Sequence, residues 1–117
     1  YNYLKKVGNK MGARTNFELQ DAKGSVWLYS HSGGDDKSMD FAKALEHARP
    51  RWGDTPYAIR MVVSHLIQDR LLDDTGYGLT SYEAGEESYD PLTANFETKV
   101  VYYEKEFFTF DEFVEKF

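Results

Sequence analysis

The chain has 117 residues, of which 41% are hydrophobic and 16% aromatic, and its formal net charge is −6. This length suits one domain, and the aromatic content excludes an intrinsically disordered chain. The absence of cysteine excludes disulfides, a thiol nucleophile and cysteine-ligated metal centres. No apolar run approaches the roughly 20 residues of a membrane-spanning helix, so we expect no membrane association.

The charge is unevenly distributed along the chain. Residues 1–68 hold 10 Lys and Arg against 7 Asp and Glu, whereas residues 69–117 hold 4 against 13. An acidic surface keeps a protein soluble, and it also attracts a positively charged partner. We therefore consider two interpretations, a solvated surface and an acidic mimic that occupies a DNA- or RNA-binding protein. Direct DNA binding is not expected.

The first residues predict a basic arm followed by a hairpin. Residues 1–14 are basic and weakly patterned, and we expect a single α+β domain over residues 15–117. Polar and apolar residues alternate over 16–20 and over 25–31, which is the period of a half-buried strand. Turn-forming residues between these segments, at 21–24, complete the pattern of a β-hairpin.

Two helices are expected next. Apolar residues at helical spacing from Phe41 to Ala48 predict a helix that is capped by Asp36 or Ser38 and ended by Pro50. A broader apolar stripe follows and predicts a central helix that reaches Leu71. Thr55 is expected at its N-cap, with Pro56 at the first helical position.

The last part of the chain predicts two further strands, a hairpin and a terminal helix. We expect strands over 77–82 and 95–104, separated by an acidic loop, and a turn at 104–106 that leads into Phe107 and Phe108. Thr109 and Glu112 have the spacing of a capping box, which predicts a short helix from there to the end.

This order, ββααβββα, predicts an α+β fold. We expect a small antiparallel sheet with two central helices on one face and a short C-terminal helix. Phe108 and Phe113 have the spacing of a hydrophobic staple at the start of the last helix.

The segment from Tyr29 to Gly34 is the first candidate site. His31 is a residue type that titrates near neutral pH, Ser32 offers a hydroxyl, and Gly33 and Gly34 allow backbone amides to approach a ligand. The alternative is a histidine at the sheet edge followed by an ordinary glycine turn. Adjacent residues of a strand point to opposite faces, so His31 and Ser32 do not make a nucleophile pair by adjacency.

The connection between the two helices is the second candidate site. Arg51 beside Trp52 is a combination that binds phosphate and stacks on a base. The alternative is that Trp52 fills the helix junction. Arg60, which has Ser64 one turn away, is expected either to pair internally or to join His31, Arg51 and Tyr77 in one small-molecule site.

Several of these motifs together resemble a group of small proteins of tailed bacteriophages. The resemblance extends over residues 11 to about 114. It departs from the group at Ser32, where tryptophan is often found. The motifs that carry it are Met11-Gly12-Ala13-Arg14-Thr15-Asn16, Tyr29-Ser30-His31-Ser32-Gly33-Gly34, Arg51-Trp52-Gly53-Asp54, Tyr57 with Arg60, and Thr75-Gly76-Tyr77-Gly78. The resemblance implies a setting in the cytoplasm of an infected or lysogenic bacterium and names no reaction.

The function expected from these observations is binding without catalysis. The leading hypothesis is a phage accessory protein that binds a host or defence component. The alternatives are the acidic nucleic-acid mimic and a nucleotide-binding protein or weak hydrolase that uses the His31 loop. We expect no cofactor, and the three histidines lack metal-ligand spacing; an oligomer is left open. The candidate binding residues are His31, Ser32, Gly33, Gly34, Arg51, Trp52, Tyr57, Arg60 and Tyr77.

Overall fold

A computed structural model describes residues 13–117, so most of the expected basic arm lies outside the described residues. The two remaining arm residues are docked on the domain. Ala13 is buried and its carbonyl oxygen accepts a hydrogen bond from the Gly34 amide at 3.0 Å. The carbonyl oxygen of Arg14 accepts from the Ser88 amide, also at 3.0 Å.

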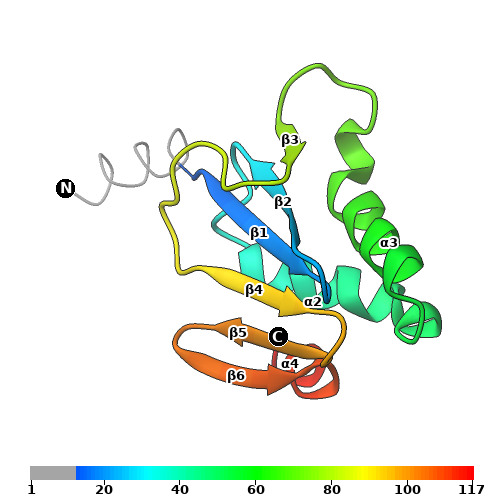
Figure 1. The fold of residues 1–117 in the computed structure, drawn as a ribbon. Helices are drawn as coiled ribbons and strands as arrows, with labels where there is room; N and C mark the ends of the chain where they lie inside the picture. Colours follow the sequence, from blue (N-terminus) through cyan, green and yellow to red (C-terminus); the bar gives the residue numbers. More distant parts are fainter. Residues whose placement is uncertain (1–12) are drawn as a thin grey trace.

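The described residues form an α+β fold around one six-stranded sheet with the order β3-β2-β1-β4-β5-β6 (Figure 1). Neighbouring strands are antiparallel except β1 and β4, which are parallel, so the sheet is mostly rather than wholly antiparallel. The parallel pair arises because β4 enters the sheet beside β1 only after the helices and a long loop. The strands are β1 (Thr15–Gln20), β2 (Ser25–Ser30), β3 (Tyr77–Thr80), β4 (Leu92–Asn95), β5 (Val100–Tyr103) and β6 (Glu106–Thr109).

Three helices lie on one face of this sheet, and Figure 1 looks onto the opposite face. They are α2 (Lys37–His47), α3 (Thr55–Ile67) and α4 (Phe110–Lys116), with short 3₁₀ turns at Arg49–Arg51 and Gln68–Arg70. None of the helices within residues 13–117 is long and apolar enough to cross a membrane.

Two helix boundaries differ from the expected ones. Asp54, not Thr55, occupies the N-cap of α3, so Pro56 is the second helical residue rather than the expected first. The helix ends at Ile67 rather than at Leu71, because the next three residues tighten into a 3₁₀ turn. Asp36 occupies the N-cap of α2, but its side chain makes no capping hydrogen bond.

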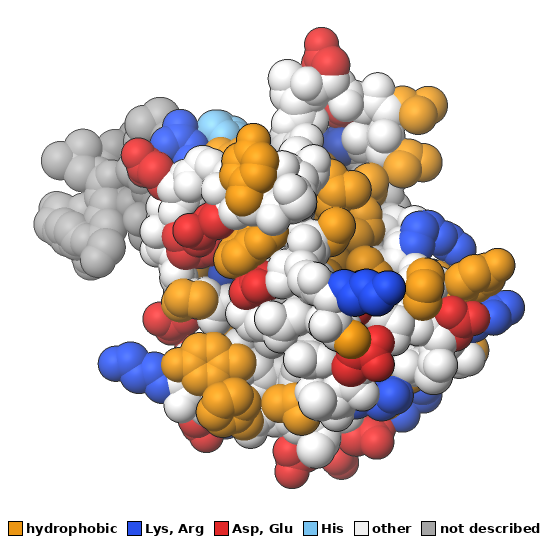
Figure 2. All heavy atoms as spheres, in the orientation of Figure 1, with side chains coloured by type: hydrophobic (Ala, Val, Ile, Leu, Met, Phe, Trp, Pro, Cys, Tyr) orange, Lys and Arg blue, Asp and Glu red, His pale blue; other side chains and the backbone are white. Residues whose placement is uncertain are grey.

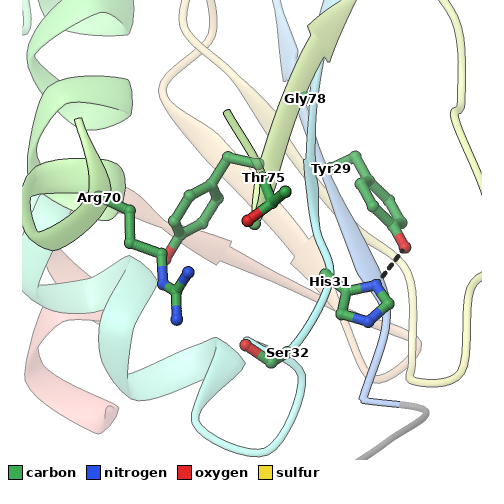
Figure 3. Close-up of a pocket in the computed structure, with 8 residues that line it drawn as sticks. Tyr29, His31, Ser32, Arg70, Thr75 and Gly78 are labelled. Carbon is green, nitrogen blue, oxygen red and sulfur yellow. Dashed lines mark hydrogen bonds between the residues drawn. The ribbon is translucent and has the colours of Figure 1, made fainter. Parts of the chain in front are cut away.

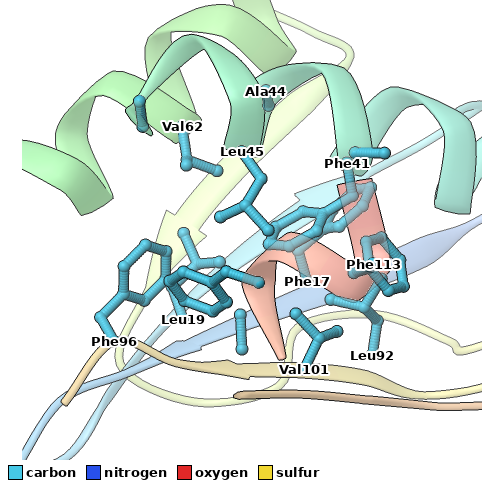
Figure 4. Packing of buried hydrophobic residues seen from close by; sticks show 14 of the residues in the cluster. Phe17, Leu19, Phe41, Ala44, Leu45, Val62, Leu92, Phe96, Val101 and Phe113 are labelled. Carbon is cyan, nitrogen blue, oxygen red and sulfur yellow. The ribbon is translucent and has the colours of Figure 1, made fainter. Parts of the chain in front are cut away.

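The core lies between the sheet and the helices (Figure 4). Strand alternation directs Phe17 and Leu19 of β1 toward the helices, and the Phe17 ring stacks on that of Phe41 of α2 with centroids 5.8 Å apart. Burial of aromatic rings removes a large apolar area from water per residue, which stabilises a domain of this size. Further fully buried core residues are Leu45, Val62, Phe96, Val101, Phe110 and Phe113.

The expected single strand over 95–104 is confirmed only over Val100–Tyr103, which form β5. Strand β4 lies earlier, within the expected acidic loop, and a turn separates it from β5. Asn95 causes the turn, because its Oδ1 accepts hydrogen bonds from the amides of Glu97 at 2.9 Å and Thr98 at 3.0 Å. Lys99 then adopts a positive φ of 59°, and the chain reverses into the β5–β6 hairpin that the sequence does predict.

The predicted capping box of the last helix is confirmed. The Thr109 hydroxyl accepts from the Glu112 amide at 3.1 Å, and Glu112 Oε1 accepts from the Thr109 amide at 2.8 Å. The rings of Phe108 and Phe113 lie 5.7 Å apart, so the hydrophobic staple also forms. These contacts dock α4 on the end of the sheet.

Candidate functional site

A cavity of about 420 Å³ lies where β2 ends beside β3 (Figure 3). Its volume is within the range of about 300–1,000 Å³ that is typical of small-molecule sites. Three of the predicted site residues line it, namely His31, Ser32 and Tyr77. The other lining residues are Tyr29, Arg70, Thr75, Gly76 and Gly78. We call this cavity the β3-edge pocket.

The antiparallel pairing of β2 with β3 builds one wall of the pocket. Tyr29 stands opposite Gly78 in the register, and the His31 amide donates to the Gly76 carbonyl at 2.9 Å. Each aromatic side chain therefore faces a residue without a side chain, which leaves open space over the edge strand. The Tyr29 hydroxyl and His31 Nδ1 lie 3.3 Å apart, so the two side chains are held together (Figure 3).

Arg70 supplies the guanidinium of the pocket from the 3₁₀ turn after α3. Gly76 has a φ of +100°, and a Cβ atom built on it would lie 3.0 Å from Cδ of Arg70, so the arginine stem rests against glycine backbone. The only ion pair of Arg70 within residues 13–117 joins its Nη1 to Asp73 Oδ2 at 3.5 Å. This separation is long for a charge-assisted hydrogen bond, so the guanidinium retains donor capacity.

Tyr77 separates this pocket from a smaller polar cleft beside α3. Burial raises the pKa of the Tyr77 hydroxyl, and the nearby carboxylates of Asp40 and Asp69 raise it further. Tyr77 is therefore a neutral hydrogen-bonding group at physiological pH and does not act as a phenolate.

The two glycines of the His31 loop serve packing. A Cβ atom on Gly34 would overlap the ring of Tyr89, and one on Gly33 would overlap the Ser30 hydroxyl. The Tyr89 hydroxyl in turn donates to Asp35. The loop is therefore clamped against the 81–91 segment, and Gly33 and Gly34 do not line the pocket.

The predicted site residues between the helices lie in a different place. Trp52 fills the helix junction, as the alternative interpretation has it: its Nε1 donates to the Leu45 carbonyl at 2.9 Å, and its ring lies 5.2 Å from that of Phe110. The Arg51 guanidinium lies 4.5 Å from the centroid of the Tyr57 ring, and Nη1 lies 3.4 Å from Asp54 Oδ2.

Arg60 is also separate from the pocket. It is exposed on α3, where its Nη1 donates to Ser64 Oγ at 3.3 Å, the internal pairing considered from the sequence. Neither Arg60 nor Trp52 lines the cavity that His31 and Tyr77 share. Of the residues expected in one small-molecule site, His31 and Tyr77 line this cavity, whereas Arg51 and Arg60 do not.

Sequence reasoning assigned no role to Tyr29, although it opens the first candidate segment, and it missed Arg70. Tyr29 is two residues from His31 on the same strand, so alternation alone places both side chains on one face. Arg70 was hidden in the expected continuation of α3, and only the return of the chain at Gly76 brings it to the pocket. Thr75, Gly76 and Gly78 belong to a motif that carries the phage resemblance; as part of the segment 73–78 they could offer oxygen ligands to a cation, but the sequence favours a helix end followed by a strand start.

A buried polar cluster fastens the 81–91 segment to the domain. Glu87 accepts hydrogen bonds from the Thr15 hydroxyl at 2.7 Å and from the amides of Asn16 at 2.9 Å and Tyr89 at 3.1 Å. Lys37 Nζ lies 3.5 Å from Glu87 Oε1 and donates to the Asp90 carbonyl at 2.7 Å. Burial lowers the pKa of Lys37 to about 8, against the opposing effect of Glu87.

These contacts also bear on the acidic half of the chain. Glu87 is paired with Lys37, Asp111 lies 2.7 Å from Arg49 Nη1, and Glu86 lies 3.9 Å from Arg14 Nη1. Pairing reduces the negative charge that would imitate a nucleic-acid backbone. The acidic mimic stays a prediction.

The histidines of the two helices approach each other. The rings of His47 and His65 lie 5.2 Å apart, and burial followed by repulsion from His47 lowers the pKa of His65. Within residues 13–117 no group of three or more His, Asp or Glu side chains is arranged to hold a metal ion.

Comparison with known proteins adds no relative to this description. No protein-family model, no curated protein and no solved structure matches the chain. The proposals below accordingly rest on the geometry and on the resemblance stated above.

Proposed function

We propose that this protein is a small phage accessory protein that binds a host or defence protein in the bacterial cytoplasm, without catalysing a reaction. The observation that carries the proposal is an aromatic pair on the sheet face opposite the helices, in which Tyr102 is half-buried and Phe107 is exposed. Their ring centroids lie 5.0 Å apart, and Phe107 is 74% exposed. The resemblance to phage proteins supplies the setting.

Strand alternation explains why this pair faces outward. Val101 and Phe108 pair with each other in the β5–β6 ladder and are buried against the helices. The adjacent pair, Tyr102 and Phe107, therefore points to the other face. Figure 2 shows hydrophobic side chains lying together over this hairpin. Exposed aromatic clusters of this kind mark protein-binding surfaces, because interface hot spots are enriched in large aromatic residues.

The surroundings of the pair indicate the chemistry of the partner. The adjoining turn holds Glu104 and Glu106 around a single Lys105, and the chain is acidic overall. A partner with an apolar pocket and a basic rim is complementary to this surface in both shape and charge. We therefore expect a basic protein surface rather than nucleic acid to occupy the pair.

The test compares two charged substitutions in the full chain. Phe107→Glu places a carboxylate in the aromatic pair, whereas Leu72→Glu places one at another apolar position, which is 94% exposed and belongs to the α3–β3 connection. The proteins are immobilised, exposed to bacterial lysate, and the retained proteins identified by mass spectrometry. Affinity is then measured with the purified partner.

We expect one protein that the wild type and Leu72→Glu both retain and that Phe107→Glu loses. With the purified partner, Phe107→Glu should raise the dissociation constant by a factor of about 30 or more, which corresponds to a loss of about 2 kcal/mol of binding free energy, the scale of a hot-spot residue. A partner whose affinity both variants reduce equally would contradict the aromatic pair as the binding surface.

A further inference from the structure

We propose that the β3-edge pocket is a binding site for a nucleoside phosphate, independent of the aromatic pair on the sheet face. Its lining combines the two kinds of group that such a ligand requires. Tyr29 and His31 provide planar rings, and Arg70, Ser32 and Thr75 provide hydrogen-bond donors for phosphate oxygens. The volume of about 420 Å³ accommodates a ligand of this class.

The ring-binding part follows from the glycines of β3. Gly76 and Gly78 stand opposite His31 and Tyr29, so no side chain of β3 covers the two rings. The contact between the Tyr29 hydroxyl and His31 Nδ1, at 3.3 Å, fixes their relative position. The two rings meet edge to face, at 62° with centroids 6.5 Å apart, and the Tyr29 ring also lies against the Gly85 backbone. The exposed His31 ring, held in place by Tyr29, is therefore the surface on which a nucleobase can stack with little loss of side-chain entropy.

The phosphate-binding part is centred on Arg70. Figure 3 shows Arg70 and Ser32 on the same side of β2, with the guanidinium extended toward the serine. A guanidinium binds phosphate through two parallel hydrogen bonds, and neighbouring hydroxyls complete the set of donors. The ion pair of Arg70 with Asp73, at 3.5 Å, is loose enough for a phosphate to replace the carboxylate.

The glycine backbone joins the two parts. Gly76 directly precedes the edge strand β3. Figure 3 shows Tyr29 and His31 on one side of β2 and Arg70 and Ser32 on the other, so a ligand that contacts both groups passes over the backbone at Gly76, against which Arg70 rests. Any side chain larger than hydrogen at Gly76 would press on the Arg70 stem and adopt a strained positive φ. The pocket thus depends on glycine at this position for both its shape and its cation.

The test uses isothermal titration calorimetry and amide chemical-shift mapping of the full chain with four kinds of probe. These probes are the 5′-monophosphates of the common nucleosides, adenosine, ribose 5-phosphate and inorganic phosphate. We expect at least one nucleotide to bind with a micromolar to submillimolar dissociation constant and to shift the Gly76 and Gly78 amides. Adenosine and inorganic phosphate should each bind at least about tenfold more weakly, because each engages only one part of the pocket.

Three variants make the test specific. Arg70→Gln should weaken nucleotide binding at least about tenfold, and Asp73→Asn should strengthen it severalfold, because it frees the guanidinium and removes a negative charge. Arg60→Gln is the matched control on the same side of the sheet; it lies outside the pocket and should leave the affinity unchanged. Thermal melts confirm that each variant is folded.

Three results would overturn the proposal. The first is the absence of any amide shift in the pocket at millimolar nucleotide. The second is an equal loss for Arg70→Gln and Arg60→Gln, which would show nonspecific attraction to positive charge. The third is equal affinity for inorganic phosphate and for nucleotides, which would show that the rings take no part. None of these results depends on Phe107, so the pocket and the aromatic pair are tested separately.

Discussion

The ammonium nitrogen of Lys37 lies 3.5 Å from a carboxylate oxygen of Glu87, and Lys37 is only 1% exposed. A lysine is rarely buried so completely, since removal of its charge from water is costly unless a partner compensates. Here Glu87 and the Asp90 carbonyl are the partners. The effect of burial on the lysine pKa exceeds the opposing effect of these partners, so the pKa is lowered to about 8. Lys37 therefore ties α2 to the 81–91 segment while remaining sensitive to pH.

This relationship predicts that stability rises with pH in an unusual range. Unfolded Lys37 holds its proton up to its ordinary pKa of 10.5, whereas in the folded protein it loses the proton near pH 8. Between these values the unfolded state binds more protons, so the free energy of unfolding increases with pH. From pH 7 to pH 10, the contribution of Lys37 should grow by about 2–3 kcal/mol.

The measurement is a set of urea melts of the wild type and Lys37→Met at pH 7, 8, 9 and 10. The difference between their free energies of unfolding isolates Lys37, because tyrosines and other groups that titrate in this range are common to both proteins. The free energy of unfolding of the wild type should increase relative to that of the variant as the pH rises. A difference that stays constant from pH 7 to pH 10 would contradict the buried, charged lysine.

Glu87 should be far more important to stability than its neighbour Glu86. Glu87→Gln replaces a carboxylate oxygen with an amide in a cluster of donors, and we expect a loss of about 2–3 kcal/mol, the scale of hydrogen bonds to a charged group. Glu86→Gln is the matched control, since Glu86 is 78% exposed and 3.9 Å from Arg14. Its effect should stay within about 0.5 kcal/mol. Similar denaturation midpoints for the two variants would contradict the role of Glu87.

Gly34 should not tolerate even a methyl group. Gly34→Ala drives Cβ into the Tyr89 ring, and overpacking of this kind costs about 1–3 kcal/mol. Gly53→Ala is the control, because a Cβ atom at that position meets nothing within 4 Å. Thermal melts should show a lower midpoint for Gly34→Ala alone. Restoration of stability by Gly34→Ala combined with Tyr89→Ala would confirm that the ring is the cause.

The C-terminal helix should depend more on its buried ring than on its cap. A helix of seven residues does not persist alone in water, so α4 needs tertiary packing. Phe113 is fully buried, and Phe113→Ala should cost about 3–5 kcal/mol. Thr109→Ala removes one capping hydrogen bond and should cost about 1 kcal/mol. Equal and small losses in urea melts would mean that α4 is not part of the folded core.

The elements that were predictable from sequence are those specified by neighbouring residues. The capping box of Thr109 and Glu112 predicts the start of α4, and alternation with a polar turn predicts the β1–β2 hairpin. Strand β4 was missed because Leu92–Asn95 is only four residues long and follows an acidic loop. Its identity depends on pairing with β1, a strand from the opposite end of the chain.

Only part of the candidate site could be predicted from the sequence, because some of its residues have no local signal. His31 and Tyr77 are residue types that draw attention by their chemistry, and the structure places both in the pocket. Arg70 looks like an ordinary helix-surface arginine in the sequence. Lys37 likewise has no local signal of burial, because Glu87 approaches it from a segment fifty positions away. A contact between residues far apart in the chain produces no periodic pattern in the sequence.

Strand β4 is synthesised long after β1, so the parallel β1–β4 pair can form only late in synthesis. Thr93 of β4 donates to Glu18 of β1 across 75 positions of the chain. At synthesis rates of about 5–20 residues per second, roughly 4–15 seconds pass between the synthesis of β1 and that of β4. During that interval the residues of the β1–β2 hairpin and of helices α2 and α3 have been synthesised, whereas the partner for one edge of β1 has not. The open edge of β1 is therefore closed only after residue 95 has been synthesised.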